Sequence, residues 1–598
     1  MNQIAKILLI VSGTLPVISC NNEFLQRDPL DEISNDIYWK TENDLAVYNN
    51  SIYDLARNDN DVPILMAHDD GFDSNNQSLW YLDGFADNTA PRHSRHLYYQ
   101  EVRAGLHQIP SDPQLFGWRD GGWVFLRAIN VGLANYGKAD LDPEIIDKYA
   151  AEARLFRGWF YADKVSKFGD VPWVDKELTT ESEELYAPRT PREEVMTHVL
   201  ADLDFACEKL PDDWGDGNAP GRINRWAALQ VKSRICLFEG TWRKYHGGAD
   251  PDMWLQEAAE AARELIENGP YSLYSTGDPA HDYNAIHRMT DLTGVSEVVY
   301  WRRYQLGVFT NHVQSYHRSY NGGATKSAVE DYLCTDGLPI SLSPLYKGDA
   351  VYEDIFENRD PRLRQTVLHP ADQPYYLYGN HDFAAYPYPR ITGMTGGQTS
   401  ETGYHIIKVY ENTASYATYN TSATPAIILR LGEALLNYAE AMAELGTITQ
   451  ADLDMSINLL RDRVAMPHLI LGNVAADPRY SDDGVSSLIV EIRRERRVEL
   501  FMEGFRYDDL RRWKQGKKLE IPDYGMRWDA ANKARIDPAG KVTVKSSVDP
   551  ESGVEYLDIY KGTDFAVPVF HENKHYLWPI PLSAIAQNPN LEQTPGWE

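Results

Sequence analysis

Five residues near the C-terminus, His571 to His575, have the spacing at which two histidines and a glutamate hold and use zinc in metalloproteases. That chemistry needs both imidazoles on one face of a helix and a third ligand nearby. Here Pro568 precedes the motif and Pro579 follows it, and strand-like residues flank both sides, so a long helix is disfavoured. No further histidine follows His575. The sequence therefore predicts no zinc site at this motif.

Acidic residues gather in two loop-like stretches, 58–61 and 69–73. Neither has the twelve-residue spacing of an EF-hand, so a structural calcium ion is compatible with the sequence but not indicated. The chain has no Gly-rich phosphate loop and no Gly-x-Ser-x-Gly elbow. A glycosidase would need two neighbouring carboxylates, and none of the 88 acidic residues is marked out for that role. Some pair among so many carboxylates will lie close together, so the residues alone leave a glycosidase open; they single out no catalytic residue and no cofactor.

The formal net charge of -30 argues against nucleic acid as a partner, because phosphates are bound by clustered Lys and Arg. One basic run, 493–497, departs from this acidic background. Glu495, Glu499 and Glu503 are interleaved with it at spacings of four. This pattern predicts an ion-paired helix docked on its neighbours rather than a surface for an anionic partner.

The elements that must position any site are mostly helices. Apolar periodicity, caps and stop residues predict the helices 148–168, 191–210, 224–239, 251–268, 427–445, 451–464 and 486–505. They come in pairs that resemble tetratricopeptide-like hairpins, without a clean 34-residue repeat. The stretches 58–113 and 306–420 are long, irregular and rich in aromatic residues. Since loops of this length usually carry function, we expect the binding residues there.

The first nineteen residues have the features of an export signal. Lys6 precedes an apolar run, 7–17, that is too short to span a bilayer. The run ends in Val-Ile-Ser-Cys, which resembles a bacterial lipobox with Cys20 as the acylated new N-terminus. The alternative is an ordinary secretory signal with a chance cysteine. We expect residues 1–19 to be a lipoprotein signal peptide and Cys20 to carry the lipid.

Motifs along the whole mature chain together resemble the SusD/RagB family of Bacteroidetes outer-membrane lipoproteins. They lie at 20–34, 152–161, 168–172, 239–246, 336–337, 358–363, 430–441, 503–513, 578–581, 588–591 and 595–597. The resemblance implies a mainly α fold with four tetratricopeptide-like helix pairs as scaffold, and a loop-rich region with short strands. It implies one assembly over residues 20–598, with an N-terminal SusD-like region at about 20–240 and a RagB/SusD C-terminal region at about 290–598.

The resemblance also implies a role. Such proteins sit on the outer membrane, facing the extracellular side, and bind oligosaccharides or polysaccharide without catalysis. They deliver the glycan to a SusC-like TonB-dependent transporter. Alternatives are a RagB-like lipoprotein that imports peptides and, ranked last, a surface glycoside hydrolase.

In relatives, the ligand is held by loops after the first helix and after the mid-chain strand. By position, these loops correspond to 80–98 and 300–320, where aromatic faces suit sugar rings and polar groups suit hydroxyls. The candidate contacts are Trp80, Tyr81, Asp87, Asn88, Arg92, Tyr98, Trp301, Arg303, Tyr304 and Tyr320. For each aromatic residue alone, packing in the core is an equal alternative, and turn formation is the alternative for Asp87 and Asn88.

Overall fold

The computed structural model describes residues 38–56, 66, 68, 79–91, 97–112, 118, 120–215, 221–314, 322–372, 388, 390–394, 399–411 and 422–598. The expected export signal, Cys20 and the acidic stretches 58–61 and 69–73 lie outside these residues. None of the described helices is both long enough and apolar enough to cross a membrane.

Eight helices make up the scaffold in the described part of the chain: α2 Glu42–Ala56, α4 Asp120–Asn135, α5 Pro143–Phe168, α6 Arg192–Lys209, α7 Arg225–His246, α8 Pro251–Asn268, α13 Leu431–Glu444 and α16 Ser487–Glu499. The shorter α-helices are α3 Leu97–Arg103, α9 Asp282–Arg288, α11 Lys326–Glu330, α12 Pro361–Thr366, α14 Gln450–Asp454, α15 Ile457–Arg463, α17 Arg506–Arg512, α18 Ala530–Ile536 and α19 Leu582–Gln587. The 3-10 helices are η2 Tyr81–Phe85, η3 Tyr136–Lys138, η4 Glu183–Tyr186, η5 Glu353–Phe356, η6 Pro370–Asp372, η10 Pro478–Asp483 and η11 Gly516–Glu520. The prediction of a mainly α fold is confirmed.

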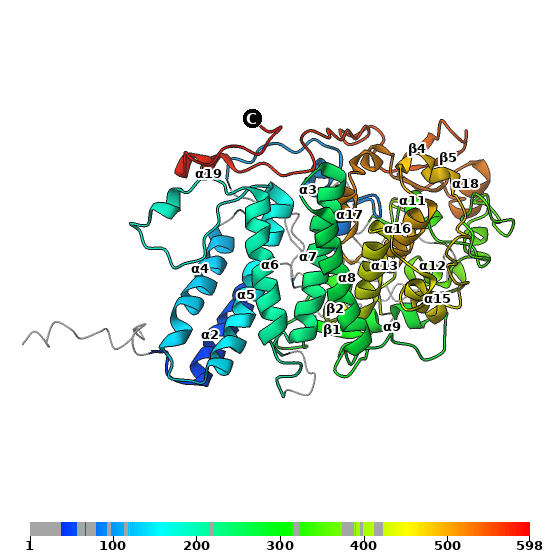
Figure 1. The fold of residues 1–598 in the computed structure, drawn as a ribbon. Helices are drawn as coiled ribbons and strands as arrows, with labels where there is room; N and C mark the ends of the chain where they lie inside the picture. The colour runs from blue at the N-terminus through cyan, green and yellow to red at the C-terminus, as the bar shows by residue number, and fades with distance from the viewer. Residues whose placement is uncertain are drawn as a thin grey trace, which may run out of the picture.

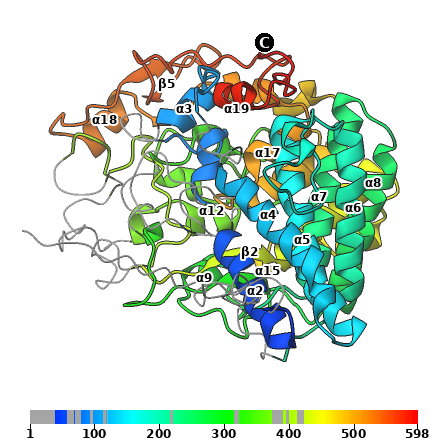
Figure 2. The same ribbon diagram turned by 90° about the vertical axis from the view of Figure 1, so that its left-hand side faces the viewer.

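The long helices form a continuous row. Helix α4 packs on α2 and α5, and the contacts then run through α6, α7, α8 and α13 to α16. Figure 1 shows this row across the molecule, and Figure 2 shows it on one side with α9, α12, α18 and β5 on the other. The consecutive helices α5–α6 and α7–α8 contact each other as helical hairpins do, and α2–α4 and α13–α16 contact each other across intervening segments.

In the described part of the chain, two small antiparallel sheets lie outside the row. Strand β1 (Val298–Arg302) pairs with β2 (Ala426–Arg430), which joins segments that are far apart in the sequence. Strands β3 (Tyr524–Arg527), β5 (Glu555–Asp558) and β4 (Ser546–Val548) form the second sheet in that order. One cluster of buried apolar side chains runs from Trp39 to Leu591 and connects the row to the irregular segments.

The caps explain where two helices begin and end. Asp142 accepts a hydrogen bond from the Glu144 N–H at 3.0 Å and starts α5 five residues before the predicted start. Gly169, at φ 75°, ends the same helix where the sequence predicts it. The predicted helix 251–268 has the same bounds in the structure.

The prediction of one helix over 427–445 is wrong at its start. Residues 426–430 are strand β2, and the helix begins only at Leu431. In β2, Ile427 pairs with Trp301 of β1, and Arg430 is extended at φ −143°. The error has a physical cause, since a short buried apolar run has the same appearance in a strand and in a helix.

Three other predicted helices also differ from the structure. Helix α7 runs past 239 to His246, and Gly240 lets it approach α8, because a Cβ there would lie 2.8 Å from Leu255 Cγ. The predicted helix 451–464 is broken into α14 and α15 at Ser456. The predicted helix 486–505 ends at Glu499, and Met502 beyond it has a positive φ of 62°.

Helix α16 carries the basic run, and the prediction that it is ion-paired and docked is confirmed. The Glu499 carboxylate receives Arg463 Nη2 at 2.6 Å, Arg430 Nη1 at 2.8 Å and Arg362 Nη1 at 3.0 Å. Burial opposes ionisation of Glu499, but these arginines hold its pKa well below the ordinary value. The helix is thus fixed by buried charge.

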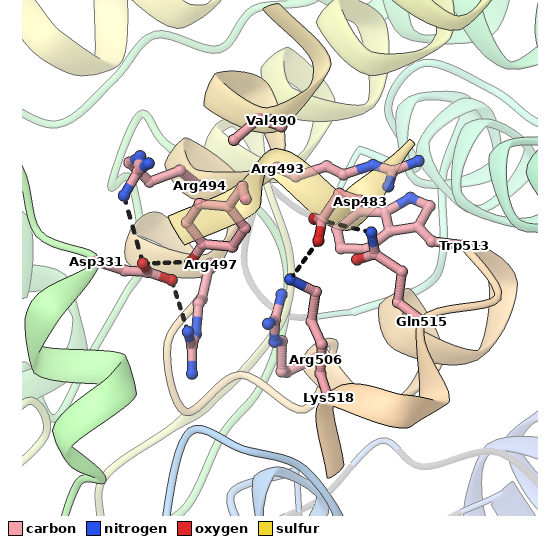
Figure 3. Close-up of a pocket in the computed structure, with 11 residues that line it drawn as sticks. Asp331, Asp483, Val490, Arg493, Arg494, Arg497, Arg506, Trp513, Gln515 and Lys518 are labelled. Carbon is pink, nitrogen blue, oxygen red and sulfur yellow. Dashed lines mark hydrogen bonds and ion pairs between the residues drawn. The ribbon is translucent and has the colours of Figure 1, made fainter. Parts of the chain in front are cut away.

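Asp331 likewise pairs with arginines of α16, which lie within two turns before Glu499. Figure 3 shows its carboxylate between Arg494 and Arg497, beside a cavity of only about 20 Å³. Arg497 Nη1 lies 2.6 Å and Arg494 Nη1 lies 3.3 Å from it. These side chains are almost wholly buried, so the arginines are structural and are not offered to a ligand.

Candidate functional site

The two loop segments that the sequence predicts as a site do meet in the structure, at His68. The Tyr304 hydroxyl donates to the His68 carbonyl oxygen at 2.9 Å and accepts from the His68 N–H at 2.8 Å. The Trp80 indole nitrogen lies 3.3 Å from His68 Nε2. Residues 224 positions apart in the sequence are therefore joined through one histidine.

The His68 ring is neutral, because burial lowers its pKa to about 3. Its Nε2 also lies 3.1 Å from the Pro425 carbonyl oxygen. A neutral imidazole nitrogen can accept from the Trp80 indole or donate to this carbonyl, but not both at once. In either tautomer, His68 links the segment before η2 to the chain just before β2.

Several candidate side chains are in the core and do not line an open surface. Trp80, Trp301 and Tyr304 are 5%, 4% and 2% exposed. Trp301 packs with Leu292 and Val298 in a small apolar cluster. For these three aromatic residues, the structure shows the packing alternative.

Asp87 and Asn88 are also buried, and both hold arginines. The Asp87 carboxylate receives Arg506 Nε at 2.7 Å and Nη2 at 2.9 Å, and Asn88 Oδ1 accepts from Arg497 Nε at 2.8 Å. Burial opposes ionisation, but Arg497 and Arg506 hold the pKa of Asp87 well below its ordinary value. These two residues therefore fix the chain after η2 to α16 and α17.

The remaining candidates differ in position. Tyr98, in α3, is half-buried with its ring centroid 6.0 Å from that of Trp578. Arg303 is half exposed, with its guanidinium 3.4 Å from Asp291. Tyr81 begins η2, but its side chain lies outside the description, and Arg92 and Tyr320 lie outside the described residues altogether.

A tight turn after β1 forms the exposed part of this region. Gln305 and Phe309 exchange backbone hydrogen bonds of 2.8 and 3.0 Å, which closes residues 305–309. Together with the two residues before them, they make up what we call the 303–309 turn. Its Leu306 and Val308 side chains are 58% and 77% exposed. These two residues are not among those predicted from the sequence, since apolar residues at a loop tip carry no pattern of their own.

The 303–309 turn rests on stacked rings. The Phe309 ring is parallel to that of Tyr304 within 16°, with centroids 5.1 Å apart. The Arg302 guanidinium lies 4.6 Å from the Phe309 ring centroid and 5.1 Å from that of Tyr304. Because Tyr304 is in turn bonded to His68, the exposed side chains are carried on a rigid base.

The histidine motif near the C-terminus is a turn and not a helix, as the prolines predict. The His575 N–H donates to the His571 carbonyl oxygen at 2.8 Å, and the two rings are 5.1 Å apart. Burial and then His571 and Lys574 lower the pKa of His575 to about 4. Within the described ranges, no three His, Cys, Asp or Glu residues gather in a way that could hold a metal ion.

Comparisons with known proteins agree over the whole chain. A family model described as the SusD family matches residues 291–597, and a model described as starch-binding and associating with the outer membrane matches residues 67–237. SusD-like protein P2 of Formosa agariphila is 24% identical over 480 residues, which cover 79% of each chain. A SusD-like protein of Bacteroides ovatus is 21% identical over 607 residues, which cover 99% of this chain and 98% of the relative.

The fold is also found among solved structures. A SusD-like carbohydrate-binding protein of Bacteroides fragilis superposes with a TM-score of 0.70 at 21% identity. The match covers 93% of this chain and 100% of that protein. At this identity the similarity shows the shared fold.

Proposed function

Because the chain belongs to the SusD family, we propose that it binds oligosaccharides or polysaccharide at the cell surface without catalysing their cleavage. In this proposal, residues 20–598 act as one assembly and pass the glycan to a SusC-like TonB-dependent transporter in the outer membrane. The match to a starch-binding family model and the likeness to a carbohydrate-binding protein support a glycan as ligand.

The observation that carries the proposal is the joining of two distant segments at His68. It gives the 303–309 turn a fixed base while Arg303, Leu306 and Val308 remain open to solvent. A guanidinium can donate to sugar hydroxyls, and apolar side chains can cover the C–H face of a ring. A fixed base lowers the entropy that is lost when a ligand is bound.

The binding test compares the mature protein, residues 20–598, with a turn variant that combines Arg303→Ala, Leu306→Ser and Val308→Ser. All three side chains are at least half exposed, so the fold should be unchanged. We expect the turn variant to bind the preferred polysaccharide at least tenfold more weakly in isothermal titration calorimetry. Leu342→Ala, which removes an exposed apolar side chain elsewhere, is the control and should bind as the parent does.

Peptide import is the second candidate function, because exposed apolar side chains such as Leu306 and Val308 can also hold peptides. A peptide library tested beside the polysaccharide panel separates the two. Binding of peptides with no binding of any polysaccharide would replace the glycan proposal by the peptide proposal. Release of shorter products from a bound polysaccharide would contradict the non-catalytic role.

The lipid anchor is tested in cells. We propose that Cys20 carries the lipid and holds the protein on the outer face of the outer membrane. Cys20→Ala should move most of the protein from the membrane fraction to the soluble fraction, since the anchoring acyl chains would be lost. Cys207→Ala, at a cysteine of helix α6, is the matched control and should remain with the membrane. Membrane retention of Cys20→Ala in cells without the transporter would contradict the anchor.

A further inference from the structure

A large cleft lies far along the chain from the 303–309 turn, at the N-terminal end of the helix row. Its walls are helix α4, the segment 172–186 and helix α19, and its volume is about 890 Å³. We call the segment 172–186 the arm. Figure 1 shows the arm (blue-green) extending beside α4, below α19. The volume is near the upper end of the range for small-molecule sites, so several linked sugar rings would fit.

The arm is held at both ends, so the cleft exists without a ligand. At its base, the Asn130 amide of α4 donates to the Val174 carbonyl oxygen at 3.0 Å. At its far end, the Asn590 amide donates to the Tyr186 carbonyl oxygen at 2.7 Å, and the Asn588 amide donates to that of Ala187 at 2.9 Å. A cleft fixed in this way loses little conformational freedom on binding.

The lining presents flat aromatic surfaces. Trp123 of α4 is half-buried, and its ring packs edge-to-face on Trp118 at 5.5 Å and on Phe160 at 5.7 Å. Tyr186, at the end of the arm, is 55% exposed. The Trp123 ring is thus held by its neighbours, and the Tyr186 ring is open to solvent. Such ring faces suit stacking on the apolar face of a sugar.

The charges that border the cleft are paired with each other. Arg127 Nη2 lies 3.5 Å from Glu177, and Lys176 forms an ion pair with Glu184. Because positive and negative side chains are both present and paired, the lining favours neither an anionic nor a cationic ligand. Hydroxyl and amide groups of Thr179, Thr180 and Gln587 supply hydrogen-bonding positions for a neutral polar ligand.

We propose that this cleft binds a neutral oligosaccharide and that it is a second glycan site made of different residues from the 303–309 turn. Helices and an irregular segment form its walls, and none of its lining residues belongs to a strand, so the described lining offers no sheet edge for an extended peptide. A neutral carbohydrate fits the open rings, the paired charges and the dispersed hydroxyls together.

The test uses five neutral probes: maltohexaose, cellohexaose, laminarihexaose, mannohexaose and xylohexaose. Each is titrated calorimetrically into the mature protein that carries the turn variant, so that only the cleft is measured. We expect at least one probe to bind. Tyr186→Ala should weaken that binding at least fivefold, whereas Tyr186→Phe keeps the ring and should restore it. Val124→Trp places an indole at an exposed lining position and should block the cleft.

Each other outcome overturns the proposal. No binding of any probe, or binding that Tyr186→Ala and Val124→Trp leave unchanged, means that the cleft is not a glycan site. Binding of peptides but not of the probes assigns the cleft to a different ligand. If the parent protein binds glycan and the turn variant does not, the cleft proposal fails while the proposed function stands. Leu342→Ala is again the control, and the circular dichroism spectra of all variants should match.

Discussion

Proteins usually keep charged side chains in water and apolar side chains in the core. Two kinds of region in this molecule do the opposite: the surroundings of helix α16 and the exposed 303–309 turn and cleft. Around α16, arginines and carboxylates are buried and paired, as at Glu499 and Asp331. At the 303–309 turn and in the cleft beside the arm, apolar side chains such as Val308 and Tyr186 are open to solvent. A buried charge is tolerated only where its partners are in place. Large contiguous patches of exposed apolar surface mark interaction sites, whereas single exposed apolar side chains are common.

The difference teaches which residues can change without loss of the fold. The arginines of α16 hold segments from distant parts of the sequence, including Asp87 after η2 and Asp331 after α11. Leu306 and Val308 are apolar and exposed, so they form no such ion pairs. We therefore expect the charged interior to be sensitive to substitution for stability, and the exposed sites to be sensitive for binding only.

The largest effect should follow from Glu499→Ala. It would leave Arg362, Arg430 and Arg463 buried without one of their carboxylates. We expect the free energy of unfolding to fall by about 3–5 kcal/mol, measured by urea denaturation. Arg364→Ala breaks an exposed pair with Asp372 and is the control, with an expected loss below about 1 kcal/mol. Equal losses in both variants would remove the contrast between buried and surface charge.

A pH-dependent effect should follow at Asp83, which is wholly buried in η2. Burial raises the pKa of its carboxyl to about 7, against an ordinary value of 3.8. The folded protein therefore holds a proton that the unfolded chain releases, and this group lowers stability as the pH rises from about 4 to 7. Asp83→Asn removes the ionisation. Between about pH 4 and pH 7, we expect the free energy of unfolding of the variant to rise relative to that of the wild type, by on the order of 2–4 kcal/mol.

The measurement is chemical denaturation of both proteins at several pH values. Asn at this position keeps an oxygen that can accept the Met502 N–H, so the local fold should persist. Asp564→Asn, at an exposed carboxylate, is the control. A stability difference between Asp83→Asn and wild type that does not change with pH would show that Asp83 is ionised in the folded protein.

The smallest effect on stability is expected at the exposed turn. Leu306→Ser together with Val308→Ser removes apolar side chains that are more than half exposed, so the free energy of unfolding should change by less than about 0.5 kcal/mol. Urea denaturation of this variant measures whether stability is unchanged, and glycan titration of the same variant measures whether binding is weakened. A large loss of stability would place these side chains in the core and contradict the contrast.

The sequence could predict the scaffold because helix signals are local. The periodicity and caps of 251–268, the glycine after Phe168 and the interleaved charges of α16 all depend on residues close in the sequence. The start of the 427–445 segment could not be predicted, because its choice of strand depends on pairing with β1, more than a hundred residues earlier.

The candidate site could be predicted only in part. Family position pointed to two segments that do meet in the structure, at His68, and their role in ligand binding stays a prediction. Family position does not predict which side chains face solvent, because an aromatic residue is common both in a core and in a binding site. Trp80 and Tyr304 are in the core. The exposed Leu306 and Val308, and the cleft beside the arm, arise from tertiary packing and have no pattern in the sequence.

The most direct test of the central claim is hydrogen–deuterium exchange of the mature protein with and without the polysaccharide that binds best in the panel. We predict that the ligand slows exchange in peptides covering the 303–309 turn and leaves the exchange of α16 unchanged, because α16 is already fixed by buried ion pairs. Protection confined to other surfaces, with no change at 303–309, would contradict the proposed binding site.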